Sequence, residues 1–108
     1  MNITEDVCTL LYGSNAALRL LLTSGCAITD ANGTIINVQS GNANFDAGIY
    51  GIALGDYVTD QTYFQSLTFN GGAVNITEDD GIDLYGSSSA SSLMLKATGG
   101  SITKHTSW

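Results

Sequence analysis

The sequence has no proline, only 3 basic residues and only 2 cysteines among its 108 residues, and each shortage excludes a class of protein. Against 10 acidic residues, Arg19, Lys96 and Lys104 leave a formal net charge of -7. Electrostatic binding to nucleic acid or to an anionic membrane is therefore not expected. The longest apolar stretch, 18–22, is interrupted by Arg19 and is too short to span a bilayer. Because 44% of the residues are hydrophobic and only 12% are charged, the composition favours a folded chain over a disordered one.

The two cysteines, Cys8 and Cys26, are too few for a small fold stapled by several disulfides. They also lack the paired short spacing of a zinc site. Free cysteine is among the most buried residue types, so the sequence favours two small buried apolar side chains. A single bridge between Cys8 and Cys26 is the alternative.

Internal repeats are the strongest signal in the chain. The segment Asn2 to Asp6 recurs at 75–79, and Tyr12-Gly13-Ser14 recurs at 85–87 with the same offset in sequence number. A shorter period of about 24 residues aligns 45–52 with 69–76 without gaps. It places isoleucines at positions 28, 52, 76 and 102, and three such steps account for the long offset. The chain therefore contains about four copies of one unit.

Each unit contains three short β runs separated by glycine, asparagine, aspartate and serine, which are turn residues. This pattern predicts an all-β fold, a short parallel β-helix of about four coils, in which equivalent apolar positions stack from coil to coil. The predicted single domain spans 1–108, with coils at 2–29, 30–53, 54–77 and 78–103 and a short tail at 104–108. The alternative is an antiparallel β-sandwich or jelly roll, which also has many short strands.

The repeating unit resembles the coil of right-handed parallel β-helix proteins, among them phage virion decoration proteins, tail fibres, adhesins and pectate-lyase-like enzymes. The resemblance implies a rod of stacked coils that is often trimeric in viruses. We accordingly expect a homo-oligomer, trimer first, with a larger protein shell or fibre as a further partner.

Two ladders of apolar side chains are expected to fill the centre of the coils. Each ladder would run up one side of the stack. Every coil would add one side chain to it, because equivalent positions lie one coil apart. The predicted members are Leu22, Ile28, Phe45, Ile52, Phe69, Ile76, Leu95 and Ile102.

The segment 1–22 is the most apolar part of the chain. Leu10 and Leu21 are each adjacent to another leucine, so they point away from the coil interior and need a cover. A protein interface is the predicted cover, and a local cap is the alternative. A second set of interface candidates consists of the aromatic residues of the middle coils, which would bind sugar rings or a neighbouring subunit unless they pack inside: Tyr50, Tyr57, Tyr63 and Phe64.

The sequence offers little catalytic chemistry. His105 is the only histidine, and the serine tract 87–92 lacks a nucleophile elbow. Carboxylates recur at Asp56 and Asp60 and in the acidic stretch 78–83, which suggests either an acid pair or solvated turns. No Asp-x-Asp-x-Asp calcium loop is present. We therefore predict no catalytic residue, no cofactor and no metal ligand, with calcium at the acidic stretch as the alternative.

These observations predict a non-enzymatic structural protein of an extracellular assembly. The resemblance further implies a virion surface component, such as a capsid decoration protein or a tail-fibre element, located on a virion or an extracellular surface. The alternatives are an adhesin or glycan-binding module and a fragment of a polysaccharide-degrading β-helix enzyme.

Overall fold

The structure is a computed structural model that describes residues 2–5, 7–55, 60–79, 81–85 and 88–104. All regular secondary structure in these ranges is β, and every strand pair is parallel. Nothing in the described ranges is a helix of the length and hydrophobicity needed to cross a membrane. The parallel pairing confirms the predicted β-solenoid of about four turns and excludes the antiparallel sandwich.

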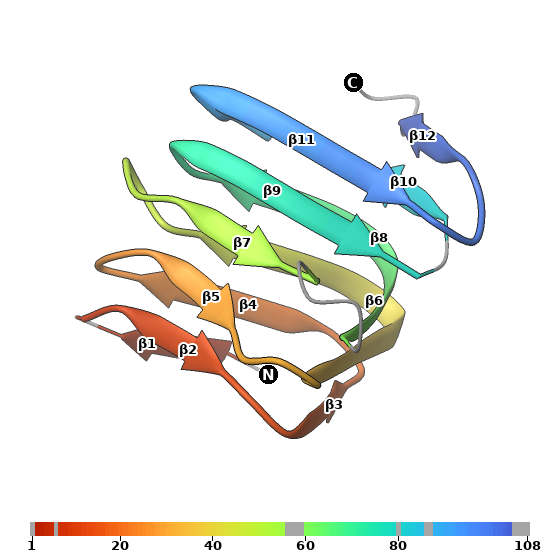
Figure 1. The fold of residues 1–108 in the computed structure, drawn as a ribbon, viewed down its shortest axis with the longest axis horizontal. Helices are drawn as coiled ribbons and strands as arrows, with labels where there is room; N and C mark the ends of the chain where they lie inside the picture. The colour runs from red at the N-terminus through yellow and green to blue at the C-terminus, as the bar shows by residue number, and fades with distance from the viewer. Residues whose placement is uncertain (1, 6, 56–59, 80, 86–87, 105–108) are drawn as a thin grey trace.

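Two sheets form the wall of the solenoid (Figure 1). The seven-stranded sheet, called sheet A here, contains β1 (Asn2–Glu5), β3 (Ser14–Ala17), β4 (Leu20–Ser24), β6 (Ile35–Asp46), β8 (Gln61–Asn70), β10 (Ile82–Leu84) and β12 (Ile102–Lys104). The five-stranded sheet, called sheet B, contains β2 (Thr9–Leu11), β5 (Ile28–Asp30), β7 (Ile52–Leu54), β9 (Ala73–Glu78) and β11 (Ser92–Ala97). The first strands lie at the lower end in Figure 1 and the last strands at the upper end.

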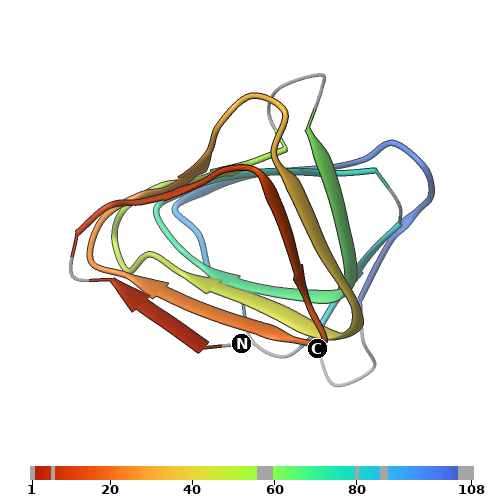
Figure 2. The same cartoon turned by 90° about the horizontal axis from the view of Figure 1, so that it is seen from below.

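The coil has the cross-section of a rounded triangle when it is viewed along the stack (Figure 2). Sheet A covers two of the three sides because β6 changes register between Val38 and Asn42. The first part of β6 pairs with β3 and the second part with β4. Sheet B forms the third side.

The length of a turn varies along the chain, and this corrects the predicted ladders. The average turn is about 21 residues. Ile52 pairs with Ile28 as predicted, but the next residue of its column is Val74, while Ile76 pairs with Leu54. A column here means residues in register one above another. The ladder is therefore wrong above Ile52, because the corners between strands differ in length.

The upper members of the predicted ladders are also displaced. Leu95 stands on Ile76 in sheet B, and Ile102 stands on Ile82 in sheet A. By contrast, Leu22, Phe45 and Phe69 form the predicted column in sheet A.

The two copies of the long repeat also do not lie at equivalent positions in the solenoid. Asn2 to Glu5 is β1 of sheet A, whereas the identical segment 75–78 lies in β9 of sheet B. Three turns above Asn2 stands Thr68, reached through Leu21 and Asn44. The second copy begins only after the chain has turned the next corner. The offset between the two copies therefore corresponds to three full turns of the solenoid plus one further side of the triangular coil.

One continuous apolar core fills the stack, and most of its members are fully buried. Phe45 and Phe64 meet inside it edge to face, with ring centroids 5.6 Å apart. The buried apolar residues are Leu20, Leu22, Ile28, Ile36, Val38, Ala43, Phe45, Ala47, Ile52, Leu54, Phe64, Leu67, Phe69, Val74, Ile76, Ile82 and Leu84. Leu95 is only partly buried and Ile102 is exposed, so the top of the core is thinner than predicted.

Candidate functional site

The outer face of sheet B is the most distinctive surface of the solenoid. Its central column reads Leu10, Thr29, Ala53, Asn75 and Met94 from the lower end to the upper end. The large residues at the two ends are exposed, and the three residues between them are half-buried. This face is therefore low in the middle and raised at both ends.

A shallow groove of about 440 Å³ runs along this face. Beside the central column it is lined by a second column of very small residues: Ala27, Gly51, Ala73 and Ser92. None of the residues that line the groove has an ionisable side chain. The groove is therefore suited to close packing against another surface. Its lining contains the hydroxyls of Thr29 and Ser92 but no acid or base that would activate them.

The predicted interface residues lie on different parts of the surface. Leu10 belongs to the outer face of sheet B, whereas Leu21 is exposed on β4 of sheet A beside β1. Tyr50 is exposed in the turn before β7, and Tyr63 is half-buried in β8. The structure therefore does not bring these side chains together into one patch.

The other two aromatic candidates add nothing to an exposed ledge. Phe64 is buried in the core, against Phe45, and this corrects its inclusion among the interface candidates. Its position in β8 explains the burial, since Phe64 pairs in register with the buried Val38 of β6. Tyr57 lies outside the described residues.

The acidic stretch does not form one solvated cluster. Glu78 is fully buried, and its carboxylate accepts a hydrogen bond of 2.8 Å from the backbone N–H of Phe64. Asp79 and Asp83 are half-buried, while Asp80, Asp56 and His105 lie outside the described residues. Within the described ranges, no three histidine, cysteine, aspartate or glutamate side chains come together in a way that could hold a metal ion.

Two further buried carboxylates tie neighbouring coils together. Asp60 accepts hydrogen bonds from the backbone N–H groups of Gly33 and Thr34, at 2.8 and 3.0 Å. Asp30, one coil away, accepts one from the N–H of Gly55 at 2.8 Å. Carboxylates that accept backbone N–H groups in this way hold a corner in place. This role could not be predicted from the sequence, because it depends on which corners are stacked.

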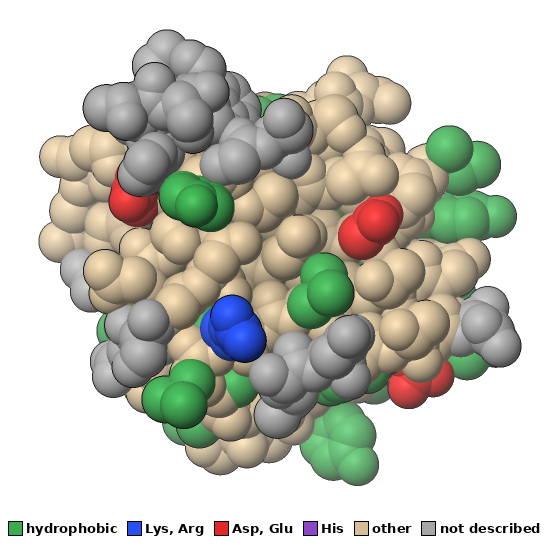
Figure 3. Space-filling model, turned by 180° about the vertical axis from the view of Figure 1, so that it is seen from behind, with side chains coloured by type: hydrophobic (Ala, Val, Ile, Leu, Met, Phe, Trp, Pro, Cys, Tyr) green, Lys and Arg blue, Asp and Glu red, His purple; other side chains and the backbone are tan. Residues whose placement is uncertain are grey.

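Most of the outer face of sheet A that is visible from behind consists of backbone and uncharged polar side chains, and the charged and apolar side chains on it stand apart from one another (Figure 3). Here the amides and hydroxyls of successive coils bond to one another. The Asn42 side chain donates to the Thr68 hydroxyl and accepts from the Ser66 hydroxyl, at 3.0 and 2.8 Å. Further along the same two strands, the Asn70 amide donates to Asp46 at 3.1 Å. These hydrogen bonds between side chains stabilise the stack.

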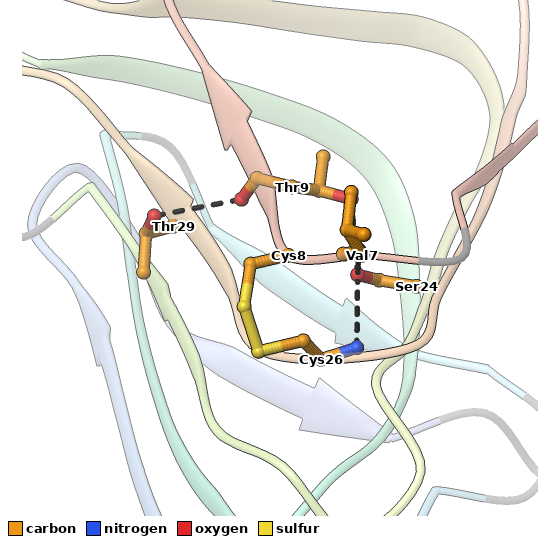
Figure 4. The surroundings of a disulfide bond; sticks show 6 residues. All are labelled: Val7, Cys8, Thr9, Ser24, Cys26 and Thr29. Atoms are coloured by element: carbon orange, nitrogen blue, oxygen red, sulfur yellow. Dashed lines mark hydrogen bonds between the residues drawn. A yellow bond between two sulfur atoms is a disulfide. The ribbon is translucent and has the colours of Figure 1, made fainter.

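The two cysteines form a disulfide, Cys8–Cys26, which corrects the expectation of two buried free thiols (Figure 4). Their Cα atoms are 4.3 Å apart, because the bridge joins the residue before β2 to the corner before β5 in the next coil. Ser24 lies beside the bridge, where its hydroxyl donates to the Val7 carbonyl at 3.0 Å and accepts from the Thr9 hydroxyl at 3.0 Å. The lowest coil is thus fastened to the coil above it by a covalent bond and by hydrogen bonds.

Comparison with known proteins found no family model that matches the chain and no similar curated protein or solved structure.

Proposed function

We propose that the protein is a non-enzymatic structural component of an extracellular assembly, and that copies associate side by side through the outer face of sheet B. The observation that carries this proposal is the uncharged groove on this face, in which many lining residues are small. Leu10 and Met94 stand exposed at the two ends of the central column of the same face. Such a surface allows the backbone of one solenoid to approach another closely. A closed homo-oligomer is the expected product, since most soluble oligomers close by rotational symmetry. The resemblance to viral β-helix proteins puts the trimer first.

The proposed location is outside the cell, on a virion or another extracellular surface. The disulfide Cys8–Cys26 supports it, because disulfides persist in oxidising compartments and are rare in the cytosol. The resemblance to β-helix proteins supports a capsid decoration protein or tail-fibre element as the specific role. The alternative is an adhesin, because an adhesin would have the same extracellular location and the same β-solenoid surface.

The absence of catalysis is part of the proposal. Glu78, Asp60 and Asp30 are occupied by backbone N–H groups of neighbouring coils. A glycosidase needs two carboxyl groups facing one substrate across a few ångströms, and a substrate groove between them. The groove of sheet B has no carboxylate in its lining.

The test is the solution mass of the purified chain and of variants of the groove. At concentrations below those at which rods form, we expect light scattering to give a closed oligomer for the wild type. Under the same conditions the pair Leu10→Ser with Met94→Ser should give a monomer with the same thermal midpoint. Ile49→Ser is the matched control, since Ile49 is 84% exposed but lies in the turn between β6 and β7, outside the strands of sheet B. A wild-type monomer at all concentrations, or an unchanged oligomer in the double variant, would contradict the proposal.

A further inference from the structure

At the upper end of the solenoid, the described residues leave the core open. Leu93 stands directly above Val74 in sheet B, so it points inward, yet it is 51% exposed while Val74 is 2% exposed. In sheet A, Ile102 stands above Ile82 and is 48% exposed, against 1% for Ile82. The apolar interior therefore continues to the upper end without a described residue above it.

The edge of β11 is also free, since no described strand pairs with it from above. The long repeat provides a comparison that shows which kind of strand pairs with such an edge. Its counterpart β4 carries Leu20-Leu21-Leu22 in place of Leu93-Met94-Leu95, and β4 pairs upward with 43–46 of β6. A strand of this sequence is therefore competent to take a further coil in parallel register. Unpaired edges of this kind are templates for association.

The lower end presents a ring of exposed apolar side chains. One stands at each of the three corners of the lowest coil: Val7 between β1 and β2, Tyr12 between β2 and β3, and Leu18 between β3 and β4. They are 66%, 74% and 77% exposed. The lower edges of β1 and β2 also end their sheets. Both ends of the stack thus combine free strand edges with exposed apolar side chains.

The two ends differ in charge. Residues 1–19 contain Glu5, Asp6 and Arg19, so the side chains of the lowest coil have a net charge of -1, whereas residues 85–108 contain Lys96 and Lys104 and no acidic residue. The described strands of these segments lie at opposite ends of the stack (Figure 1). Like ends therefore repel each other and unlike ends attract. This charge pattern selects head-to-tail contact over head-to-head contact.

We infer that a second copy of this chain stacks on the upper end, with its lowest coil continuing both sheets above β11 and β12. The contact is heterologous, so it repeats without closing and produces rods. It is separate from the side-by-side contact of the proposed function, because it uses the ends of the solenoid and not its wall.

Two neighbouring residues of β11 allow a matched test. Leu93 points toward the open core and Met94 points outward from the wall, and the two are 51% and 62% exposed. We expect sedimentation velocity of the wild-type chain to show mass rising with concentration, and electron microscopy to show rods of uniform width. Leu93→Lys should abolish the rods. Met94 belongs to the side-by-side surface, so Met94→Lys should narrow the rods to single solenoids without abolishing them.

A charge variant keeps the test valid if Leu93→Lys fails to fold. Lys96→Glu with Lys104→Glu makes both ends acidic, so axial association should weaken by about tenfold at low salt, and less at high salt. Rods that persist in both variants would overturn the inference. A closed oligomer without rods in the wild type would overturn it and leave the side-by-side assembly intact, whereas a monomer throughout would overturn both.

Discussion

The repeated segment Asn-Ile-Thr-Glu gives an internal comparison between identical local sequences in different packing. Ile76 is fully buried, with Leu54 below it and Leu95 above it, whereas Ile3 is half-buried and has only Leu22 above it. Replacing Ile76 by alanine should cost about 4 kcal/mol, because it removes a fully buried side chain and leaves a cavity. The same change at Ile3 should cost about 1 kcal/mol, since roughly half of the side chain is already in water.

The measurement is urea denaturation of both variants, followed by circular dichroism and extrapolated to zero urea. The difference of about 3 kcal/mol corresponds to roughly a hundredfold change in the folding equilibrium. The local sequence is the same at both sites, so each variant is the control for the other. Equal losses at Ile3 and Ile76 would refute the view that stacking between coils, and not local sequence, provides the stability.

Three further predictions concern a corner, the disulfide and the absence of catalysis. Gly55→Ala should destabilise the fold by about 3 kcal/mol in urea denaturation, because Gly55 has a φ of 70° and an added Cβ would collide with the Thr77 carbonyl. Gly13→Ala, with a φ of 74° but open space around it, should cost only about 1 kcal/mol. Replacing both cysteines by serine should speed hydrogen exchange in β2 by about a hundredfold and leave β7 unchanged, because the lost bridge is worth about 3 kcal/mol and acts on the lowest coil. Incubation with bacterial cell-wall and capsular glycans, with and without calcium, should release no reducing ends; cleavage lost in Asp83→Asn would contradict the structural role.

The general fold could be predicted from the sequence because short alternating apolar runs and turn residues report local structure directly. The lower columns were also predictable. Ile28 and Ile52 are in register one repeat apart, and Leu22, Phe45 and Phe69 follow nearly the same period. In this part of the chain the repeat seen in the sequence is the repeat of the coil.

The upper columns could not be predicted, because the corners absorb different numbers of residues. In sheet B, the step from Ile76 to its partner Leu95 is clearly shorter than the step from Ile28 to Ile52. A period extrapolated from the lower coils therefore assigns Ile102 to the wrong side. No local pattern indicates how many residues a corner contains, since glycine, serine and asparagine occur in short and long corners alike.

The role of a side chain was least predictable where it depends on the neighbouring coil. Glu78 and Glu5 occupy the same position of an identical segment, yet one is buried and bonded to Phe64 and the other is exposed. The disulfide was missed for a related reason. Cys8 and Cys26 become neighbours only when the first coil is shorter than the repeat seen in the sequence, as the pairing of Thr9 with Ile28 shows.

The long repeat behaves as a screw operation. Because the step from position 2 to position 75 makes three turns and one side, the second copy of Asn-Ile-Thr-Glu is both higher along the axis and rotated onto the next side of the triangle. A rod lengthened by such duplications would display the outward threonine of this segment in a new direction at every copy. A neighbour that recognises the segment would then wind around the rod, so duplication by this length changes the direction of contact as well as the length of the fibre.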